Sequence, residues 1–168
     1  MMPAVKTIWA ACFGDEPQYN DLIFEELLRP ERILVTGEGD KSPASMLCLE
    51  PFSLEAAEKS AKGAYVFGVA THPEHQGKGL STQLLDHCHQ WLAGEGYHLS
   101  ALVPAEESLF RFYGTRGHET AFSLVKLDIS AETLPPAPGN GKQRPATLEE
   151  FTHLRERCFQ DRAHLVRW

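Results

Sequence analysis

The sequence lacks the cysteine and histidine patterns that mark disulfide-rich or metal-binding domains. Its four cysteines stand far apart, each in or beside an apolar stretch: Cys12, Cys48, Cys88 and Cys158. Isolated cysteines of this kind are typical of reduced core residues in cytosolic proteins. Among the histidines, His87 and His89 are two residues apart and would lie on different faces of a helix. The sequence therefore predicts no disulfide and no metal site.

Long apolar runs and an excess of basic residues are also missing. No run approaches the roughly 18 apolar residues of a membrane-spanning helix, and the N-terminus shows no basic region followed by an apolar one. The formal net charge is −7, which argues against nucleic acid as a substrate and suits a cationic amine, although a solvated acidic surface gives the same charge. We therefore expect a soluble, cytoplasmic protein whose partners include neither a membrane nor a nucleic acid.

Two familiar phosphate-binding motifs are absent from the turn that would have to hold them, residues 76–81. A P-loop needs a glycine five positions before its Gly-Lys pair, where this chain has His72, and a serine or threonine after the lysine, where it has Gly79. The dinucleotide fingerprint needs a third glycine where the chain has Thr82. Neither a P-loop nor a dinucleotide-binding turn is predicted.

What the chain does contain is an apolar strand, a glycine turn and an amphipathic helix in succession. The strand, residues 64–71, is rich in β-branched and aromatic residues. The helix carries one apolar stripe, made of Leu80, Leu84, Leu85, Cys88, Trp91 and Leu92. Gly77 and Gly79 leave the backbone open, the helix N-terminus carries about half a positive charge, and Lys78 adds a full one. This pattern predicts an anion site, although glycines that only form a tight turn look the same.

The turn resembles the acetyl-CoA loop of the GCN5-related N-acetyltransferase (GNAT) family. That signature reads Arg/Gln-x-x-Gly-x-Gly/Ala and follows a strand ending in apolar-x-Val-x-Pro. Here the strand ends Val69-Ala70-Thr71-His72-Pro73 and the loop reads Gln76-Gly77-Lys78-Gly79-Leu80-Ser81. Gln76 and Gly79 match the family positions, whereas Ser81 replaces the last Gly/Ala and Thr71 replaces the Val.

A second block downstream resembles the family helix that ends Leu-Tyr-x-x-x-Gly-Phe. Tyr113 and Gly117 match, and Phe112 and His118 stand at the Leu and Phe positions. The chain departs from the family at two positions upstream of the tyrosine, where it has Glu106 and Leu109 in place of Asn and Ala. The resemblance covers residues 32–127. The runs Val-Ala-Thr-His-Pro and Leu-Val-Pro-Ala are also similar to the Eis branch of the family.

The resemblance implies acetyl-CoA as co-substrate, with its diphosphate on the amides of residues 77–81 and its pantetheine beside the strand end. The implied cofactor-binding residues are Val69, Ala70, Thr71, Gln76, Gly77, Lys78, Gly79, Leu80, Ser81 and Thr82. A backbone amide near Ala70 would stabilise the oxyanion, an effect worth about 3 kcal/mol in other acyl-transfer enzymes. Tyr113 would act as general acid, because a phenol pKa of about 10 lies above a thiol pKa of about 8.5. The alternative for Tyr113 is packing at a helix end.

The resemblance also implies direct transfer of the acetyl group to a primary amine of a small molecule or peptide. The first two helices, expected at residues 3–13 and 17–29, border the acceptor pocket in the family. Candidate acceptor contacts are therefore Tyr19, Phe24, Glu25 and Glu26, the alternative being a packed stripe with a solvated acidic face. Glu50 and His72 are candidate bases acting through water. The competing function is a non-catalytic acyl-CoA-binding sensor or structural domain.

The order of elements predicts an α/β (α+β) fold of the GNAT type. We expect a mixed, mostly antiparallel sheet, splayed at the cofactor site, with helices on both faces. The expected strands are residues 31–36, 44–51, 64–71, 98–103 and 120–129.

We expect three segments along the chain. An acetyltransferase domain would span residues 1–130, a Pro/Gly-rich linker residues 131–146, and a C-terminal helix residues 147–168, opened by a capping box at Thr147 and Glu150. The sequence shows neither the family's strand before the first helix nor its last paired strand. This favours a missing C-terminal module or a homo-oligomer that completes the sheet edge.

Overall fold

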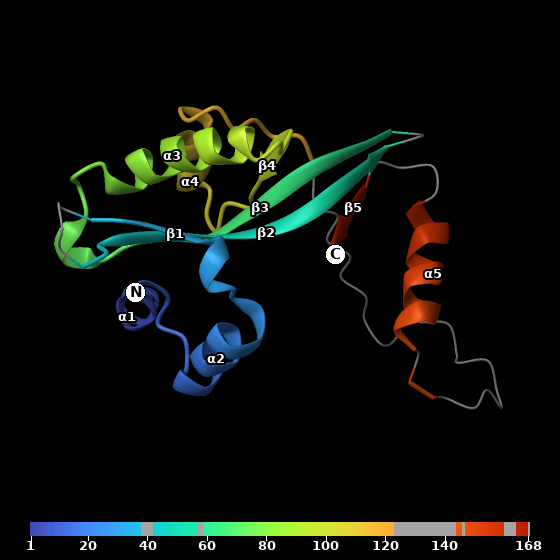
Figure 1. Ribbon diagram of the computed structural model, residues 1–168, viewed down its shortest axis with the longest axis horizontal. Coiled ribbons are helices and arrows are strands. Elements are labelled where there is room, and N and C mark those ends of the chain that lie inside the picture. Colours follow the sequence, from blue (N-terminus) through green and yellow to red (C-terminus); the bar gives the residue numbers. More distant parts are fainter. Residues whose placement is uncertain (38–41, 57–58, 123–143, 146, 160–163, 168) are drawn as a thin grey trace.

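Two long strands, β2 (Ser45–Ala56) and β3 (Lys59–Thr71), form the centre of the sheet (Figure 1). They pair antiparallel, with Ser45 opposite Thr71 at one end and Ala56 opposite Lys59 at the other. The computed structural model describes residues 1–37, 42–56, 59–122, 144–145, 147–159 and 164–167.

Three shorter strands complete the sheet. They are β1 (Ile33–Thr36), β4 (Leu99–Ala101) and β5 (His164–Arg167). Strand β1 pairs antiparallel with the first part of β2, and β5 pairs antiparallel with a later part. Strand β4 pairs parallel with β3, but only along Gly63–Tyr65. Within the described residues, the edge of β3 that faces β4 therefore has no strand partner beyond Tyr65. The predicted mixed, mostly antiparallel and splayed sheet is confirmed.

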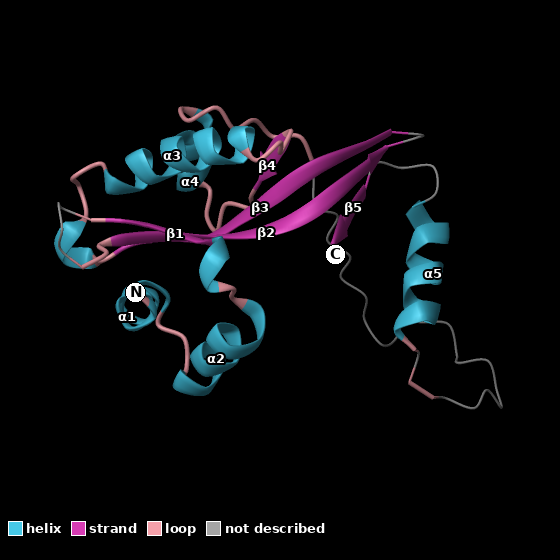
Figure 2. Cartoon of the chain, viewed as in Figure 1, coloured by secondary structure: helices cyan, strands magenta, loops and turns pink. Residues whose placement is uncertain are grey.

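Helices cover both faces of the sheet, as predicted (Figure 2). One face carries α1 (Met2–Phe13) and α2 (Pro17–Leu22), which continues into a single π-helical turn, Ile23–Leu27. The other face carries α3 (Leu80–Gly94) and α4 (Ser108–Gly114). Short 3₁₀ turns lie at Pro30–Arg32 and Pro73–His75, and α5 spans Leu148–Phe159. None of the helices in the described ranges is long and apolar enough to cross a membrane.

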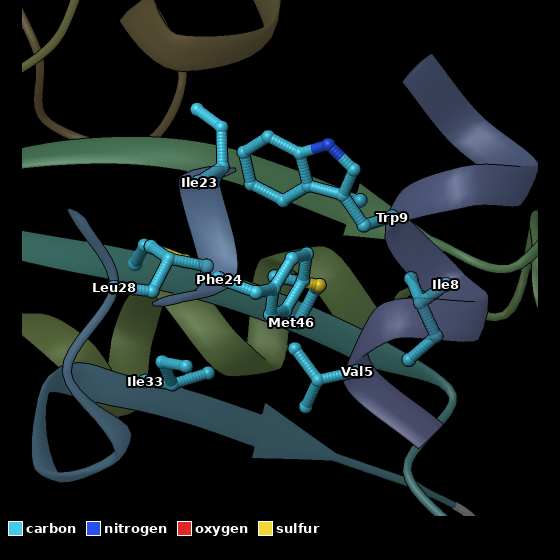
Figure 3. Close-up of a cluster of buried hydrophobic side chains, with 10 residues drawn as sticks. Val5, Ile8, Trp9, Ile23, Phe24, Leu28, Ile33 and Met46 are labelled. Atoms are coloured by element: carbon cyan, nitrogen blue, oxygen red, sulfur yellow. The ribbon is translucent and has the colours of Figure 1, made fainter. Parts of the chain in front are cut away.

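The hydrophobic core has two parts, one on each face of the sheet, because successive strand residues point to opposite sides. Met46 and Leu47 are neighbours on β2 and both are fully buried, Met46 in one part and Leu47 in the other. The part under α1, shown in Figure 3, includes Val5, Ile8, Trp9, Ile23, Phe24, Leu28 and Ile33. The part under α3 includes Leu49, Val66, Leu84, Leu85, Cys88, Leu92 and Tyr113.

A β-bulge at Gly68 bends β3 just before its end. The pairing shifts register there, since Met46 lies opposite Ala70 but Cys48 lies opposite Phe67. Gly68 has φ +59°, and a Cβ at this position would lie 2.6 Å from Cζ3 of Trp9. Glycine is thus required both by the left-handed backbone and by the close approach of α1. The bulge sets the direction of residues 69–71, which lead into the glycine turn.

The C-terminal region differs from the expectation in two respects. Residues 120–122 are not in a strand, and the rest of the strand expected over 120–129 lies outside the described residues. The capping box forms, since Thr147 Oγ1 accepts from the Glu150 amide at 3.2 Å and Glu150 Oε2 accepts from the Thr147 amide at 2.9 Å. The second difference is the length of this helix, which was expected to span residues 147–168. It ends at Phe159, and His164–Arg167 form the strand β5.

Strand β5 supplies a paired strand near the C-terminus that the sequence did not reveal. Its partner on β2 is the segment Phe52–Glu55, more than one hundred residues earlier in the chain. A pairing over such a distance leaves no local signal, and four residues are too few to show a period. The linker expected over 131–146 lies almost wholly outside the described residues, and the domain boundaries stay a prediction.

Candidate functional site

The glycine turn joins the end of β3 to the start of α3. Gly77 and Gly79 have φ values of +76° and +75°, and a Cβ at either position would meet nothing within 4 Å. Backbone conformation, rather than crowding, therefore selects glycine here. The first backbone hydrogen bond of α3 runs from the Gln83 amide to the Gly79 carbonyl, at 3.1 Å. The amides of residues 80–82 come before this bond and so have no acceptor within the helix. These amides are donors available to an anion.

Hydrogen bonds of the segment between β3 and the glycines hold the turn in place. The Gln76 Nε2 donates to the Thr71 carbonyl at 3.2 Å, which fastens the loop to the end of β3. The Glu74 amide donates to His72 Nδ1 at 3.4 Å, and the His72 amide donates to the Ala44 carbonyl at 2.8 Å. Gln76 and His72 thus have structural roles in shaping the turn.

Tyr113 lies near the C-terminal end of α4 and is buried, with 9% of its surface exposed. Its ring makes edge contacts with Phe112 and His118, at centroid distances of 5.1 and 5.7 Å. Burial raises the pKa of the Tyr113 hydroxyl above its usual value, and the positive charge of Arg116 partly offsets this. The hydroxyl therefore keeps its proton at neutral pH and is suited to donate it.

A cavity of about 420 Å³ brings the turn and Tyr113 together. Its lining residues are Val69, Ala70, Thr71, His75, Gln76, Gly77, Gly79, Leu80, Ser81, Leu109, Phe112 and Tyr113. The lining includes Tyr113 and every cofactor-binding residue that the resemblance implies except Lys78 and Thr82. The cavity combines backbone donors at a helix N-terminus with an apolar wall that includes Leu109 and Phe112. This donor set fits a ligand that has both a phosphate group and an apolar arm, as acyl-CoA does.

Three lining residues were not predicted as site residues from the sequence: His75, Leu109 and Phe112. Leu109 and Phe112 precede Tyr113 on α4 by four residues and by one. The spacing from Leu109 to Tyr113 places both on the same face of the helix, and this was the available signal. His75 lies in the 3₁₀ turn Pro73–His75, where periodicity gives no information.

The Thr82 side chain makes its hydrogen bonds outside the cavity. Its hydroxyl accepts hydrogen bonds from two nitrogens of Arg116, Nε at 3.0 Å and Nη2 at 2.6 Å. Thr82 does not line the cavity. Its side chain therefore joins α3 to the segment that follows α4.

The candidate bases do not line the cavity. Glu50 Oε2 accepts from Arg32 Nη1 at 3.1 Å, and the Glu50 side chain is 12% exposed. His72 uses its Nδ1 in the turn described above. Glu106, near the start of α4, accepts from the Ser108 hydroxyl at 2.6 Å. The structure thus places neither Glu50 nor His72 among the residues that surround the cavity.

The candidate acceptor contacts separate into two groups. Phe24 is a core residue, buried to 7% exposure and in edge contact with Trp9 at 5.7 Å. Tyr19, Glu25 and Glu26 are exposed on α2 and the π-helical turn. This arrangement matches the alternative of a packed stripe with a solvated acidic face.

The buried thiols are unsuited to catalysis. Burial raises the pKa of Cys48 to about 12 and that of Cys88 to about 11, so neither is a thiolate at neutral pH. Cys12 Sγ donates to the Thr71 carbonyl at 3.3 Å. No cysteine lines the cavity formed by the described residues, nor does any group of three or more His, Cys, Asp or Glu in those ranges suit a metal ion.

Comparison with known proteins gives a family match. The model of the acetyltransferase (GNAT) domain matches residues 1–121 of the chain. A search of curated proteins finds no significant match.

Solved structures share the fold at low sequence identity. The chain is similar to a transcriptional regulator from Bacillus halodurans C-125 (TM-score 0.59, 18% identity, covering 77% of this chain and 95% of that one). It is similar to a GCN5-related N-acetyltransferase from Anabaena variabilis (TM-score 0.59, 22% identity, 66% of this chain and 28% of that one). It is also similar to Eis1 from Mycobacterium abscessus (TM-score 0.55, 20% identity, 67% of this chain and 28% of that one). The chain thus spans less than a third of the length of the last two.

Proposed function

Because the chain belongs to the GNAT acetyltransferase family, whose domain model matches residues 1–121, we propose that it transfers an acetyl group from acetyl-CoA directly to a primary amine. The observation that supports this most strongly is the cavity itself. One cavity is lined both by the glycine turn at the start of α3 and by Tyr113 on α4. A phosphate-binding turn and a buried proton donor are the two functions that such a transfer requires from the protein.

The glycine turn would hold the diphosphate of the co-substrate. The amides of Leu80 and Ser81 lie in the first turn of α3, where the helix dipole favours negative charge. Gly77 and Gly79 leave open space where a side chain would otherwise stand. Lys78 lies between them outside the cavity lining and would add long-range positive potential.

The end of β3 would hold the acyl group. Beyond Tyr65 this edge of β3 has no strand partner within the described residues, so its backbone groups are available to a bound molecule. Ser45 Oγ donates to the Ala70 carbonyl at 2.9 Å, which fixes the strand end behind the cavity. A backbone amide near Ala70 would stabilise the negative charge that develops on the thioester oxygen.

Tyr113 would supply the proton that the reaction needs at sulfur. Bound acetyl-CoA supplies an acyl group activated as a thioester. The amine nitrogen forms the new bond to the carbonyl carbon, the carbon–sulfur bond breaks, and the Tyr113 hydroxyl donates its proton to the sulfur. The amine gives up a proton in the same reaction, and through water this proton returns to the Tyr113 oxygen, so that the products are the amide and the free thiol. Direct transfer agrees with a cavity that contains no cysteine among its described lining residues.

The acceptor would be a small molecule or a peptide that carries a primary amine. The net charge of −7 favours a cationic acceptor. Assignment to the Eis branch stays a prediction, because similarity at 20% identity to Eis1 shows the fold alone.

An amine-dependent assay of thiol release tests the proposal. Purified protein is incubated with acetyl-CoA and, separately, with polyamines, aminoglycosides and lysine-containing peptides. We expect thiol release that depends on one acceptor class and is matched by acetylated amine in equal amount. Binding of acetyl-CoA without transfer to any of these amines would instead support the sensor or structural alternative.

A further inference from the structure

We propose that Arg116 is a positioning residue that fastens the helix carrying Tyr113 to the first turn of α3. The two walls of the cavity, one from the glycine turn and one from α4, would then be held as a single unit. This inference rests on the proposed function for its effect on the co-substrate, but the link between the two helices can be tested without it.

The first half of the link joins Arg116 to α3. Arg116 Nε and Nη2 both donate to Thr82 Oγ1, at 3.0 and 2.6 Å. Thr82 is the third residue of α3 and directly follows Ser81, which lines the cavity. The two donors reach the same oxygen along converging directions, so the guanidinium plane has little freedom to turn. The contact therefore fixes Arg116 against the turn where the diphosphate would bind.

The second half of the link joins Arg116 to α4. Arg116 Nη1 donates to the Phe112 carbonyl at 2.5 Å and to Thr115 Oγ1 at 3.0 Å. The guanidinium carbon also lies 3.7 Å from the centre of the Phe112 ring. Phe112 lines the cavity and contacts Tyr113 edge-on. A cation that binds the carbonyls in the last turn of a helix also complements the helix dipole.

The hydrogen-bond count indicates positioning rather than ligand binding. A guanidinium has five N–H donors, and the four contacts to Thr82, Phe112 and Thr115 use all but one of them. Arg116 does not itself line the cavity. Lysine cannot reproduce the link, because its ammonium group lacks the planar fork that reaches both helices.

A double-mutant cycle tests the link. Acetyl-CoA affinity and the thermal midpoint are measured for the wild type, Arg116→Met, Thr82→Val and the double variant. We expect each single variant to weaken acetyl-CoA binding about tenfold, and the double variant to bind no more than about twofold worse than either, because each change breaks the same link. Thr82→Ser keeps the hydroxyl acceptor and should bind within about twofold of the wild type.

Arg111→Met is the matched control. It removes the same charge from an exposed position on α4 itself and should leave acetyl-CoA binding within about twofold of the wild type. Should Arg116→Met fail to fold, Arg116→Lys replaces it in the cycle, with the same non-additive loss expected.

Three results would overturn the proposal. They are multiplicative losses in the double variant, a Thr82→Ser variant as weak as Thr82→Val, and an Arg111→Met variant as weak as Arg116→Met. If the wild type itself does not bind acetyl-CoA, the proposed function fails, and the thermal midpoints then decide the link alone. Non-additive midpoint changes would support the link, and additive ones would reject it.

Discussion

Replacing Tyr113 with phenylalanine is expected to lower kcat for acetyl transfer by about one to three orders of magnitude, while the Kd for acetyl-CoA stays within about twofold of the wild type. The substitution removes one oxygen and leaves the ring, so the edge contacts with Phe112 and His118 remain. The loss would then reflect the missing proton donor. Steady-state kinetics with the best acceptor and calorimetric titration with acetyl-CoA measure the two quantities.

Tyr97→Phe is the control for this experiment. Tyr97 is half-buried, its ring lies tilted against that of Trp91 and under the Lys62 ammonium, and it does not line the cavity. Its hydroxyl should be dispensable for transfer. An undiminished kcat in the Tyr113→Phe variant would exclude Tyr113 as the general acid and leave it the role of a packed helix-end residue.

Replacing Ser81 with aspartate is expected to weaken acetyl-CoA binding by about ten- to a hundredfold, since two like charges would meet in a partly enclosed site. The same change should leave folding intact or raise the thermal midpoint slightly. A carboxylate in the first turn of a helix stabilises it by about 0.3–1 kcal/mol, and Ser81 is the second residue of α3. Lower affinity with equal or higher stability would separate a binding effect from a folding effect. Calorimetric titration and thermal unfolding measure the two.

Gln83→Asp supplies the matched control for the charge. Gln83 is exposed, lies two residues further along the same helix and does not line the cavity. We expect the Gln83→Asp variant to bind acetyl-CoA several times more tightly than Ser81→Asp. Equal affinities for the two variants would mean that the start of α3 does not bind the diphosphate.

The sequence was most informative where the relevant signals are local. The strand end, the glycine turn and the helix start occupy residues 64–82. The composition of the strand, the glycines of the turn and the apolar stripe of the helix can each be recognised within a few residues of sequence. In the structure β3 ends at Thr71 and α3 begins at Leu80, as expected, although β3 starts at Lys59 rather than at residue 64. Tyr113 could be assigned to the same site only through the family resemblance, since 31 residues separate it from Thr82.

The remaining features depend on contacts between distant segments. A glycine inside an apolar strand indicates a bulge, but the sequence does not show that Gly68 must also leave room for the indole of Trp9 on α1. The bonds from Arg116 to Thr82 span 34 residues, and neither residue type predicts the other. The apolar stripe of its helix allows Phe24 to face either a pocket or the core. Only its contact with Trp9, seen in the structure, shows that it belongs to the core.

The most direct test of acyl-CoA binding at this cavity is calorimetric titration of the protein with acetyl-CoA, with dephospho-CoA, ATP and NAD as controls. We predict binding in the micromolar range that is specific to CoA. The reason is that the cavity offers both backbone hydrogen-bond donors for a phosphate and an apolar wall. A folded protein that binds no acetyl-CoA, or that binds NAD or ATP equally well, would contradict the assignment and leave Gly77 and Gly79 the role of turning the chain.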